Sequence, residues 1–286
     1  MPTLALATCA AHPRLYADDL PLVRSLAALG VRSVPAIWHE PPPKGIDAWI
    51  IRSTWDYHLR AAEFLAFVER EGSARPMWNA PSLLRWNAHK TYLRDLAAHG
   101  VSVVPTLWSD GGTLPDLARE LDARGWGDVV VKPAVSASAH GARRFAARDR
   151  AEAHEHFLAL AAAGTVMVQP YLASVESYGE RSFFFMDGAY THAVQRQAVL
   201  SAGFEAERPA PLVEPTAAEL TLCRAALAAL DTPPLYARVD MAPDAEGAPR
   251  LMELELIEPR LYFREAPHAA ERLARAVASR LNGESD

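Results

Sequence analysis

The sequence predicts an α/β lobe at the N-terminus of the 286-residue chain, followed by two α+β lobes. Over the first third, apolar runs alternate with segments of helical periodicity, which is typical of a small parallel sheet wrapped by helices. Over the last third, pairs of apolar runs separated by turn residues predict antiparallel hairpins. A chain of this length can form two or three packed lobes. We expect an N-terminal lobe over residues 1–84, a central lobe over 85–170 and a C-terminal lobe over 171–286.

The expected N-terminal lobe contains three strands and two helices. Its apolar runs have the length of buried strands, and its first helix ends at Gly30, a residue favoured directly after a helix. The strands are expected at Thr3–Thr8, Val31–Ile37 and Ala48–Ile51, and the helices at Asp18–Leu29 and Ala61–Arg70.

The expected central lobe surrounds one loop. A β-branched strand at Asp128–Lys132 leads into Pro133–Arg144, whose small and polar residues are typical of a mobile loop. The other strands are expected at Val101–Thr106 and Thr165–Gln169, and the helices at Leu83–Asn87, Lys90–Ala98, Leu114–Ala123 and Ala151–Ala162.

Two hairpins and two helices make up the expected C-terminal lobe. Asp187-Gly188 between two apolar runs is a strong signal for a two-residue hairpin turn. Thr216 followed by Glu219 predicts a capping box at a helix start. The hairpins are expected at Arg181–Met186 with Ala189–Gln195 and at Leu235–Met241 with Arg250–Ile257, and the helices at Thr216–Leu230 and Ala269–Leu281.

The composition excludes several classes of protein. The formal net charge of −6 argues against a nucleic-acid binder, which needs a basic face. No apolar stretch is long enough to span a bilayer, and the N-terminus lacks the basic region of a signal peptide. With only two cysteines, Cys9 and Cys223, we expect a reduced, cytoplasmic protein without a nucleic-acid or membrane partner.

Lysine is rare in this chain, so each lysine is informative. Of the 29 basic residues, 26 are arginine and three are lysine: Lys44, Lys90 and Lys132. Lys132 ends an apolar strand directly before the small-residue loop, where an ammonium group could hold phosphate oxygens. Because arginine does not replace lysine at every site, we favour a phosphate-binding role for Lys90 and Lys132 over the alternative of surface lysines.

The strongest chemical pattern lies in the last predicted hairpin. Residues two apart on a strand share a face, so Arg238 and Asp240 point together, as do Glu253 and Glu255. Carboxylates packed together require cations, and oxygen ligands beside phosphate suit Mg²⁺. The alternative is an ordinary amphipathic hairpin with a solvated acidic face, and the spacing alone does not separate the two.

Two further segments are candidates for ligand binding. Val166–Leu172 could be a strand that runs into a hinge whose backbone binds adenine, with Glu180 bonding the ribose; a core strand followed by a loop has the same pattern. Arg52–His58 follows a predicted parallel strand at the sheet edge where ligands bind in open α/β sheets. Its polar side chains could recognise a zwitterionic small molecule.

A structural alternative exists for the second segment. Trp55 and Tyr57 could pack against another lobe, and Asp56 could cap the helix that follows.

Taken in order, these elements resemble the ATP-grasp superfamily from about Arg85 to the C-terminus. Lys90 and Lys132 match its two phosphate-binding lysines. Gln169–Leu172 matches its adenine hinge, and Glu180 matches its ribose-binding glutamate. The resemblance implies a nucleotide held between two antiparallel sheets.

The late motif is similar to that of D-alanine–D-alanine ligases, which read Arg-x-Asp and then Glu-x-Asn thirteen residues after the Asp. Here Arg238-Val-Asp240 is followed at the same spacing by Glu253-Leu-Glu255, in which glutamate replaces the usual asparagine. The resemblance implies that three carboxylates bind two Mg²⁺ ions and that Arg238 stabilises charge during phosphoryl transfer.

A closer resemblance covers most of the chain. Four segments are similar to the O-ureido-serine cyclo-ligase group, which includes the enzyme that closes the cycloserine ring. The sequence differs from that group in the stretch Gln195–Gly203 and at Arg260, where a small polar residue is more usual. Both differences lie where substrate and γ-phosphate are expected to meet. The matching segments are Thr8–Ala10, Arg52–His58, Arg85–Lys90 and Glu253–Pro259.

The resemblance implies an ATP-dependent carboxylate–amine ligase that acts on a small amino-acid-like substrate through an acyl phosphate, and intramolecular attack would close a ring. The alternatives are an ATP-grasp phosphotransferase and a nucleotide-binding regulator without chemistry. The expected cofactors are ATP and Mg²⁺, with Mn²⁺ as an alternative ion. The sequence leaves a homodimer open.

The resemblance also implies a role for each candidate residue. The catalytic residues are expected to be Lys132, Arg196 and Arg238. ATP is expected to bind Lys90, Lys132, Ser136, Gln169, Tyr171, Leu172 and Glu180. The metal ligands are expected to be Asp240, Glu253 and Glu255. The substrate is expected to contact Arg52, Ser53, Thr54, Asp56 and Arg260.

Overall fold

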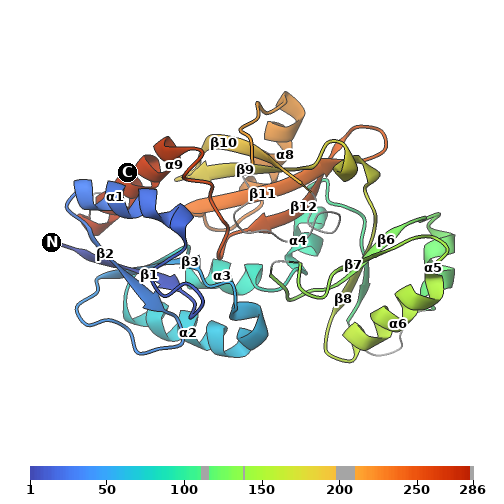
Figure 1. Cartoon of the computed structure of the whole chain (residues 1–286), viewed down its shortest axis with the longest axis horizontal. Helices are drawn as coiled ribbons and strands as arrows, with labels where there is room; N and C mark the ends of the chain where they lie inside the picture. Colours follow the sequence, from blue (N-terminus) through green and yellow to red (C-terminus); the bar gives the residue numbers. More distant parts are fainter. Residues whose placement is uncertain (111–115, 138, 198–209, 284–286) are drawn as a thin grey trace.

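Three four-stranded sheets organise the chain in the computed structural model, which describes residues 1–110, 116–137, 139–197 and 210–283. A parallel sheet lies at one end of the longest axis, and two antiparallel sheets follow it (Figure 1). The predicted order, α/β first and α+β after it, is confirmed.

The N-terminal lobe contains β1 (Thr3–Thr8), η1 (Ala17–Asp19), α1 (Leu20–Ala28), β2 (Arg32–Ile37), β3 (Ala48–Ser53), η2 (Tyr57–Arg60), α2 (Ala61–Ala74) and β4 (Met77–Trp78). The parallel strands run in the order β2-β1-β3-β4. Alternate strand residues face α1 on one side and α2 on the other. The two-residue strand β4 was not predicted, because it is too short to show a period.

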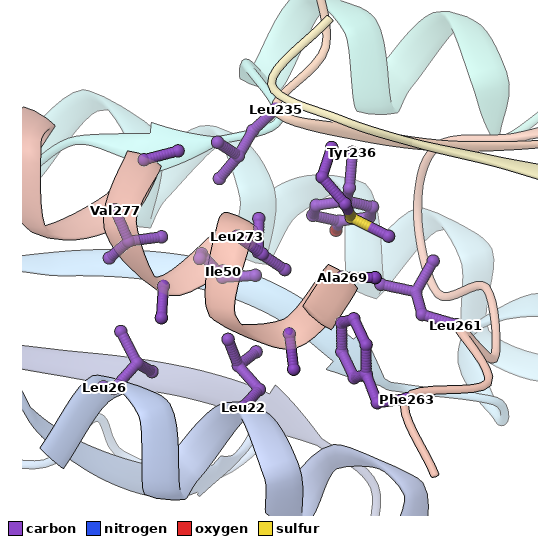
Figure 2. Close-up of a cluster of buried hydrophobic side chains, with 14 of the residues drawn as sticks. Leu22, Leu26, Ile50, Leu235, Tyr236, Leu261, Phe263, Ala269, Leu273 and Val277 are labelled. Atoms are coloured by element: carbon purple, nitrogen blue, oxygen red, sulfur yellow. The ribbon is translucent and has the colours of Figure 1, made fainter. Parts of the chain in front are cut away.

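The C-terminal helix α9 (Pro267–Leu281) returns to this lobe and packs along α1 (Figure 2). Leu22 and Leu26 of α1 meet Leu273 and Val277 of α9 over Ile50 of β3, and all five are fully buried. Each such side chain stabilises the fold by roughly 1.5–3 kcal/mol. This contact fixes the last lobe to the first.

The central region contains α3 (Pro81–Asn87), α4 (Tyr92–Ala98), β5 (Leu107–Ser109), α5 (Leu117–Ala123), β6 (Val129–Pro133), β7 (Arg143–Phe145), α6 (Arg150–Ala161) and β8 (Val166–Pro170). Its antiparallel sheet has the order β5-β8-β6-β7, and α5 and α6 cover one face. The short helices α3 and α4 pack on the other antiparallel sheet instead.

The C-terminal lobe contains η3 (Ala173–Glu176), β9 (Glu180–Met186), β10 (Ala189–Arg196), α8 (Ala217–Ala228), β11 (Tyr236–Pro243) and β12 (Pro249–Glu255). The strand order is β10-β9-β11-β12, and all pairs are antiparallel. Both predicted hairpins are confirmed, and Asp187 and Gly188 turn the first with φ of 52° and 70°. The capping box of Thr216 and Glu219 is also confirmed.

Two predicted elements are wrong in position. Val101–Thr106 is not a strand, because Pro105 lacks the N–H of a ladder; Val103 forms only an isolated bridge, and β5 follows. Lys90 does not begin a helix but lies in the turn before α4.

Two other predicted segments differ from the structure at their ends. Both ends of the predicted loop Pro133–Arg144 belong to strands, Pro133 to β6 and Arg143–Arg144 to β7, and residue 138 lies outside the described residues. Residues 114–115 of the predicted helix Leu114–Ala123 lie outside the described residues, and α5 begins at Leu117. Throughout the described ranges, every helix is too short or too polar to cross a bilayer.

Candidate active site

β11 and β12 place basic and acidic side chains on neighbouring strands. Their register pairs Arg238 with Glu255 and Asp240 with Glu253, so the two predicted pairs do lie side by side. The guanidinium of Arg238 binds the carboxylates of both Asp240 and Glu255. The hairpin therefore presents three carboxylates with one arginine among them, not a uniformly acidic face.

Asp240 lies at the centre of an ionic network. Its Oδ2 accepts from Nη2 of Arg196 and from Nη2 of Arg238, both at 2.8 Å. Its Oδ1 accepts from the hydroxyl of Ser182 at 2.6 Å. Burial raises the pKa of this carboxyl, but the two arginines outweigh burial and hold the pKa below its ordinary value. Arg196 extends the network to Glu180 at 3.1 Å.

Lys90 connects the small-residue loop to β12. Its side chain is buried, and Nζ donates to the carbonyl oxygen of Ser136 at 2.8 Å and binds Oε1 of Glu253 at 3.0 Å. Its backbone N–H donates to the carbonyl oxygen of Ala134 at 2.9 Å. One ammonium group thus holds the loop after β6 against the acidic strand.

Lys132, near the end of β6, belongs to the same electrostatic environment. Burial lowers the pKa of its ammonium group to about 8, and the positive charge of Lys90 adds to the shift. The carboxylates of Glu253 and Glu180 oppose the shift. Because Lys132 comes from one antiparallel sheet and both glutamates from the other, charged groups of the two sheets meet here.

Glu255, which is partly buried, and Glu258, which is buried, are two further acids beside this network. Burial raises the pKa of Glu255 to about 7 although Arg238 opposes the shift, and the charge of Glu253 adds to it. Burial and the charge of Glu255 raise the pKa of Glu258 well above its usual range. Glu258 was missed as a candidate, although it is the third acid of the motif Glu253–Pro259.

The expected metal ligands do not converge in this conformation. Within the described part of the chain, no three carboxylate, imidazole or thiolate side chains form a ready-made metal site. The reason is that Asp240 and Glu255 bind Arg238, whereas Glu253 binds Lys90. The three acids nevertheless offer only oxygen atoms, which are the ligands that Mg²⁺ prefers, so the donor set fits this ion.

The predicted adenine hinge is partly engaged in internal contacts. The Gln169 side chain donates to the hydroxyl of Thr106 at 2.9 Å. The backbone N–H of Tyr171 donates to the carbonyl oxygen of Asp128 at 2.8 Å, and the guanidinium of Arg144 lies 3.7 Å from the centre of the Tyr171 ring. Leu172 packs with Val175 and Ala242.

The segment expected to contact substrate is enclosed. Arg52, Ser53 and Thr54 are each at most 2% exposed. The Arg52 guanidinium binds Oδ1 of Asp19 through Nε at 2.8 Å and donates to the carbonyl oxygen of Pro259 through Nη2 at 2.9 Å. The strand β3 extends past its predicted end, and this places Arg52 inside the interface between lobes.

The residues that follow agree in part with the structural alternative. The indole N–H of Trp55 donates to the carbonyl oxygen of Glu258 at 3.0 Å, and Tyr57 is buried. Asp56 accepts from the indole of Trp38 at 2.7 Å. The capping role that this alternative gave Asp56 is wrong, because its side chain makes no cap hydrogen bond with η2 and the residue before α2 is Arg60.

Arg260 adjoins the phosphoryl-transfer candidates. Its carbonyl oxygen accepts from Nη1 of Arg238 at 3.4 Å. Its guanidinium lies 4.1 Å from the centre of the Tyr262 ring and binds Glu265 at 3.4 Å. Arg260 is therefore hydrogen-bonded, through its backbone, to a member of the Asp240 network.

The matches to known proteins cover nearly the whole chain. The family model described as D-cycloserine synthetase DcsG, N-terminal domain, matches residues 4–79. The cycloserine biosynthesis protein DcsG of Streptomyces lavendulae is 33% identical over 98% of this chain and 99% of that protein. The crystal structure of D-cycloserine synthetase DcsG superposes with a TM-score of 0.89 over 98% of this chain and 99% of that one.

More distant structures share the fold. A D-alanine–D-alanine ligase from Bacillus anthracis, solved with ATP, has a TM-score of 0.71 at 17% identity and covers 99% of both chains. A RimK-domain ATP-grasp protein from Sphaerobacter thermophilus has a TM-score of 0.70 at 18% identity over 96% of this chain and 98% of that one. The chain therefore belongs to the DcsG family and is an ATP-grasp ligase that forms a carbon–nitrogen bond.

Proposed function

We propose that the chain uses Mg·ATP to activate the carboxylate of a small amino-acid-like substrate and then joins it to a nitrogen of the same molecule. The observation that carries this proposal is the meeting of Lys90 and Lys132 with Glu253 and the Arg238–Asp240 pair. Cations for phosphate and carboxylates for a metal ion lie together there, as phosphoryl transfer requires. The 33% identity to DcsG over nearly the whole chain supports the same reaction type.

Each side chain has a proposed role in holding ATP. Lys90 and Lys132 bind phosphate oxygens, and the loop that contains Ser136 closes over them. Gln169, Tyr171 and Leu172 line the adenine site, and Glu180 bonds the ribose hydroxyls.

Glu253 and Glu255, whose side chains are 31% and 21% exposed, would hold the metal ion. Asp240 is engaged with Arg196, Arg238 and Ser182, so it would have to give up some of these contacts to act as a third ligand. Mg²⁺ neutralises charge on the transferring phosphoryl group when bound, and Mn²⁺ offers similar coordination.

The proposed reaction has two steps. A carboxylate oxygen of the substrate attacks the γ-phosphorus, ADP leaves, and Arg238 and Arg196 stabilise the charge that develops. The nitrogen then attacks the acyl carbon, the C–O bond to phosphate breaks, and the nitrogen loses a proton. The products are ADP, phosphate and an amide, which is cyclic when one molecule supplies both groups.

The substrate is proposed to lie beside Arg260. This guanidinium, held against Tyr262, can bind an anionic group of the substrate close to Arg238. We propose that Arg52 positions Arg260 and does not bind the substrate itself. Its buried side chain holds the Pro259 carbonyl, next to Arg260.

A substrate screen tests the proposal. Amino acids and their ureido and hydroxamate derivatives are supplied with Mg·ATP, and phosphate release is measured. Phosphorus NMR should show free phosphate together with an amide product, whereas a stable phosphoester would indicate a phosphotransferase. Lys132→Ala and Asp240→Asn should each abolish substrate-dependent ADP release while the protein stays folded. Unchanged turnover in both variants would refute the assignment.

A further inference from the structure

The outer edge of β12 is closed by backbone and side-chain groups of the segment 87–104. β12 is the last strand of its sheet, and such an edge normally leaves N–H and C=O groups unpaired. The backbone of Leu251 bonds to the Ser102 carbonyl at 2.8 Å and to the Val104 N–H at 3.0 Å. Beyond Leu251, side chains replace this backbone pairing.

Asn87, the last residue of α3, takes the place of a peptide group along that edge. Its Nδ2 donates to the carbonyl oxygen of Leu254 at 2.8 Å, and its Oδ1 accepts from the N–H of Leu256 at 2.9 Å. The hydroxyl of Tyr92 accepts from the N–H of Leu254 at 2.9 Å. All of these groups are buried, so breaking one of these hydrogen bonds would leave a buried polar group without a partner and would lower the stability of the fold.

The position of these contacts matters for the acids of the site. Leu254 lies between Glu253 and Glu255, and successive side chains on a strand point to opposite faces. Fixing both the N–H and the C=O of Leu254 therefore fixes the backbone from which the two carboxylates project. Lys90, three residues after Asn87, binds Glu253 directly at 3.0 Å.

We propose that Asn87 is a positioning residue for the carboxylate pair Glu253 and Glu255. It holds the backbone of β12 in place relative to Lys90, so that both carboxylates would be available to one divalent cation. This inference rests on the proposed role of the two glutamates as metal ligands. Residues that orient metal ligands from outside the coordination sphere commonly affect metal affinity strongly.

A purely structural role is the competing explanation, and the chain offers a matched control. Asn79 makes the same kind of contacts through its side-chain amide, donating to the carbonyl oxygens of Tyr236 and Leu256 at 2.9 and 2.8 Å. Its Oδ1 accepts from the N–H of Leu235 at 2.6 Å. Asn79 therefore stabilises the same hairpin as Asn87, but its hydrogen bonds in the described structure go to Leu235, Tyr236 and Leu256, not to Leu254.

The test measures binding of Mn²⁺ in the presence of ADP by electron paramagnetic resonance, so it needs no substrate. Asn87→Ala should weaken Mn²⁺ binding by about 10- to 100-fold. Asn79→Ala should change the affinity for Mn²⁺ by less than about threefold, even if it lowers the melting temperature as much as Asn87→Ala does or more. Hydrogen exchange should show loss of protection at the amides of Leu254 and Leu256 in Asn87→Ala.

A second variant covers the case in which Asn87→Ala fails to fold. Tyr92→Phe removes only the hydroxyl that accepts from Leu254, and it should weaken Mn²⁺ binding about fivefold.

Glu253→Gln separates this inference from the proposed function. If Glu253→Gln weakens Mn²⁺ binding but Asn87→Ala and Tyr92→Phe do not, Asn87 is only structural. If Glu253→Gln has no effect, the metal assignment itself is wrong, and this inference is overturned with it.

Discussion

Arg52 donates a hydrogen bond to the carbonyl oxygen of Pro259 across 2.9 Å and so joins the N-terminal sheet to the segment after β12. The neighbouring carbonyls of that segment are held in the same way: Trp55 donates to the Glu258 carbonyl at 3.0 Å. On the other side, Arg238 donates to the Arg260 carbonyl at 3.4 Å. Donors from two lobes thus fix three consecutive peptide groups beside the candidate active site.

Removing one partner of the buried Arg52–Asp19 ion pair should destabilise the fold strongly, whereas replacing both partners together by apolar residues should cost much less. Arg52→Met leaves the carboxylate of Asp19 buried without its partner, and breaking a buried ion pair in this way costs about 3–5 kcal/mol. Burial already raises the pKa of Asp19 despite Arg52, which shows how unfavourable the buried charge is. Urea unfolding of Arg52→Met should therefore show a clear loss of stability.

The double variant Arg52→Met/Asp19→Leu is the control. It removes both charges, so it should recover most of the lost free energy of unfolding. If Arg52→Met instead keeps wild-type stability and only raises KM for the substrate, Arg52 is a substrate ligand, as the sequence first indicated.

Local patterns in the sequence predicted much of the fold. Asp187-Gly188 fixes a hairpin turn because few residues adopt positive φ, and Thr216 fixes a helix start because its side chain caps the backbone. The spacing of Arg238 and Asp240 predicted their common face because strand side chains alternate. Each of these features depends on a few consecutive residues.

The contacts within the site could not be predicted in this way. Which cation binds Glu253, and that Arg196 binds Asp240, depends on how separate elements pack together. The extent of β3 shows the same limit. In the sequence, Arg52 looks like a polar residue that follows a strand. In the structure, β3 continues through Arg52, and its guanidinium donates to the carbonyl oxygen of Pro259, which is far away in the sequence.

Lys132 should make nucleotide binding dependent on pH. Burial lowers the pKa of its ammonium group to about 8, so the group is charged below this pH and neutral above it. The affinity for Mg·ADP should therefore be highest below about pH 7.5 and fall as the pH rises through 8 to 9, by up to about tenfold per pH unit. Calorimetric titration across this range measures the effect.

Lys132→Arg is the control for that prediction. The guanidinium stays charged throughout, so the fall between pH 8 and 9 should disappear, even if the absolute affinity is weaker. The low pKa of Lys132 has the opposite effect on the folding of the unliganded protein. The free energy of unfolding should rise between pH 8 and 10.5, because over this range the unfolded chain binds more protons than the folded chain. A wild-type affinity that stays constant from pH 7 to 9.5 would contradict the role of Lys132.

The contact between α1 and α9 should contribute to stability without affecting nucleotide binding. Leu273 is fully buried against Leu22 and Leu26. Leu273→Ala removes this packing, so the free energy of unfolding should fall by about 2–5 kcal/mol. Leu158→Ala, at a position that is 38% exposed, should cost far less. The affinity for Mg·ADP below the melting temperature should equal that of the wild type, and a marked loss would show that α9 also shapes the site.

Arg260 should decide which substrate the enzyme accepts. Its guanidinium lies against Tyr262, and its backbone carbonyl accepts from Arg238, so a substrate anion bound there would, in the proposed function, lie close to the transferring phosphoryl group. Arg260→Ser restores the small polar residue that is more usual in the cyclo-ligase group. It should raise KM for the preferred anionic substrate by about 10- to 100-fold, the loss of one charge-assisted contact, while leaving the affinity for Mg·ADP unchanged. Arg264→Ser, in the same segment but exposed, should leave both values unchanged. Equal effects of the two substitutions on KM would mean that general positive charge, not the placement of Arg260 beside Arg238, attracts the substrate.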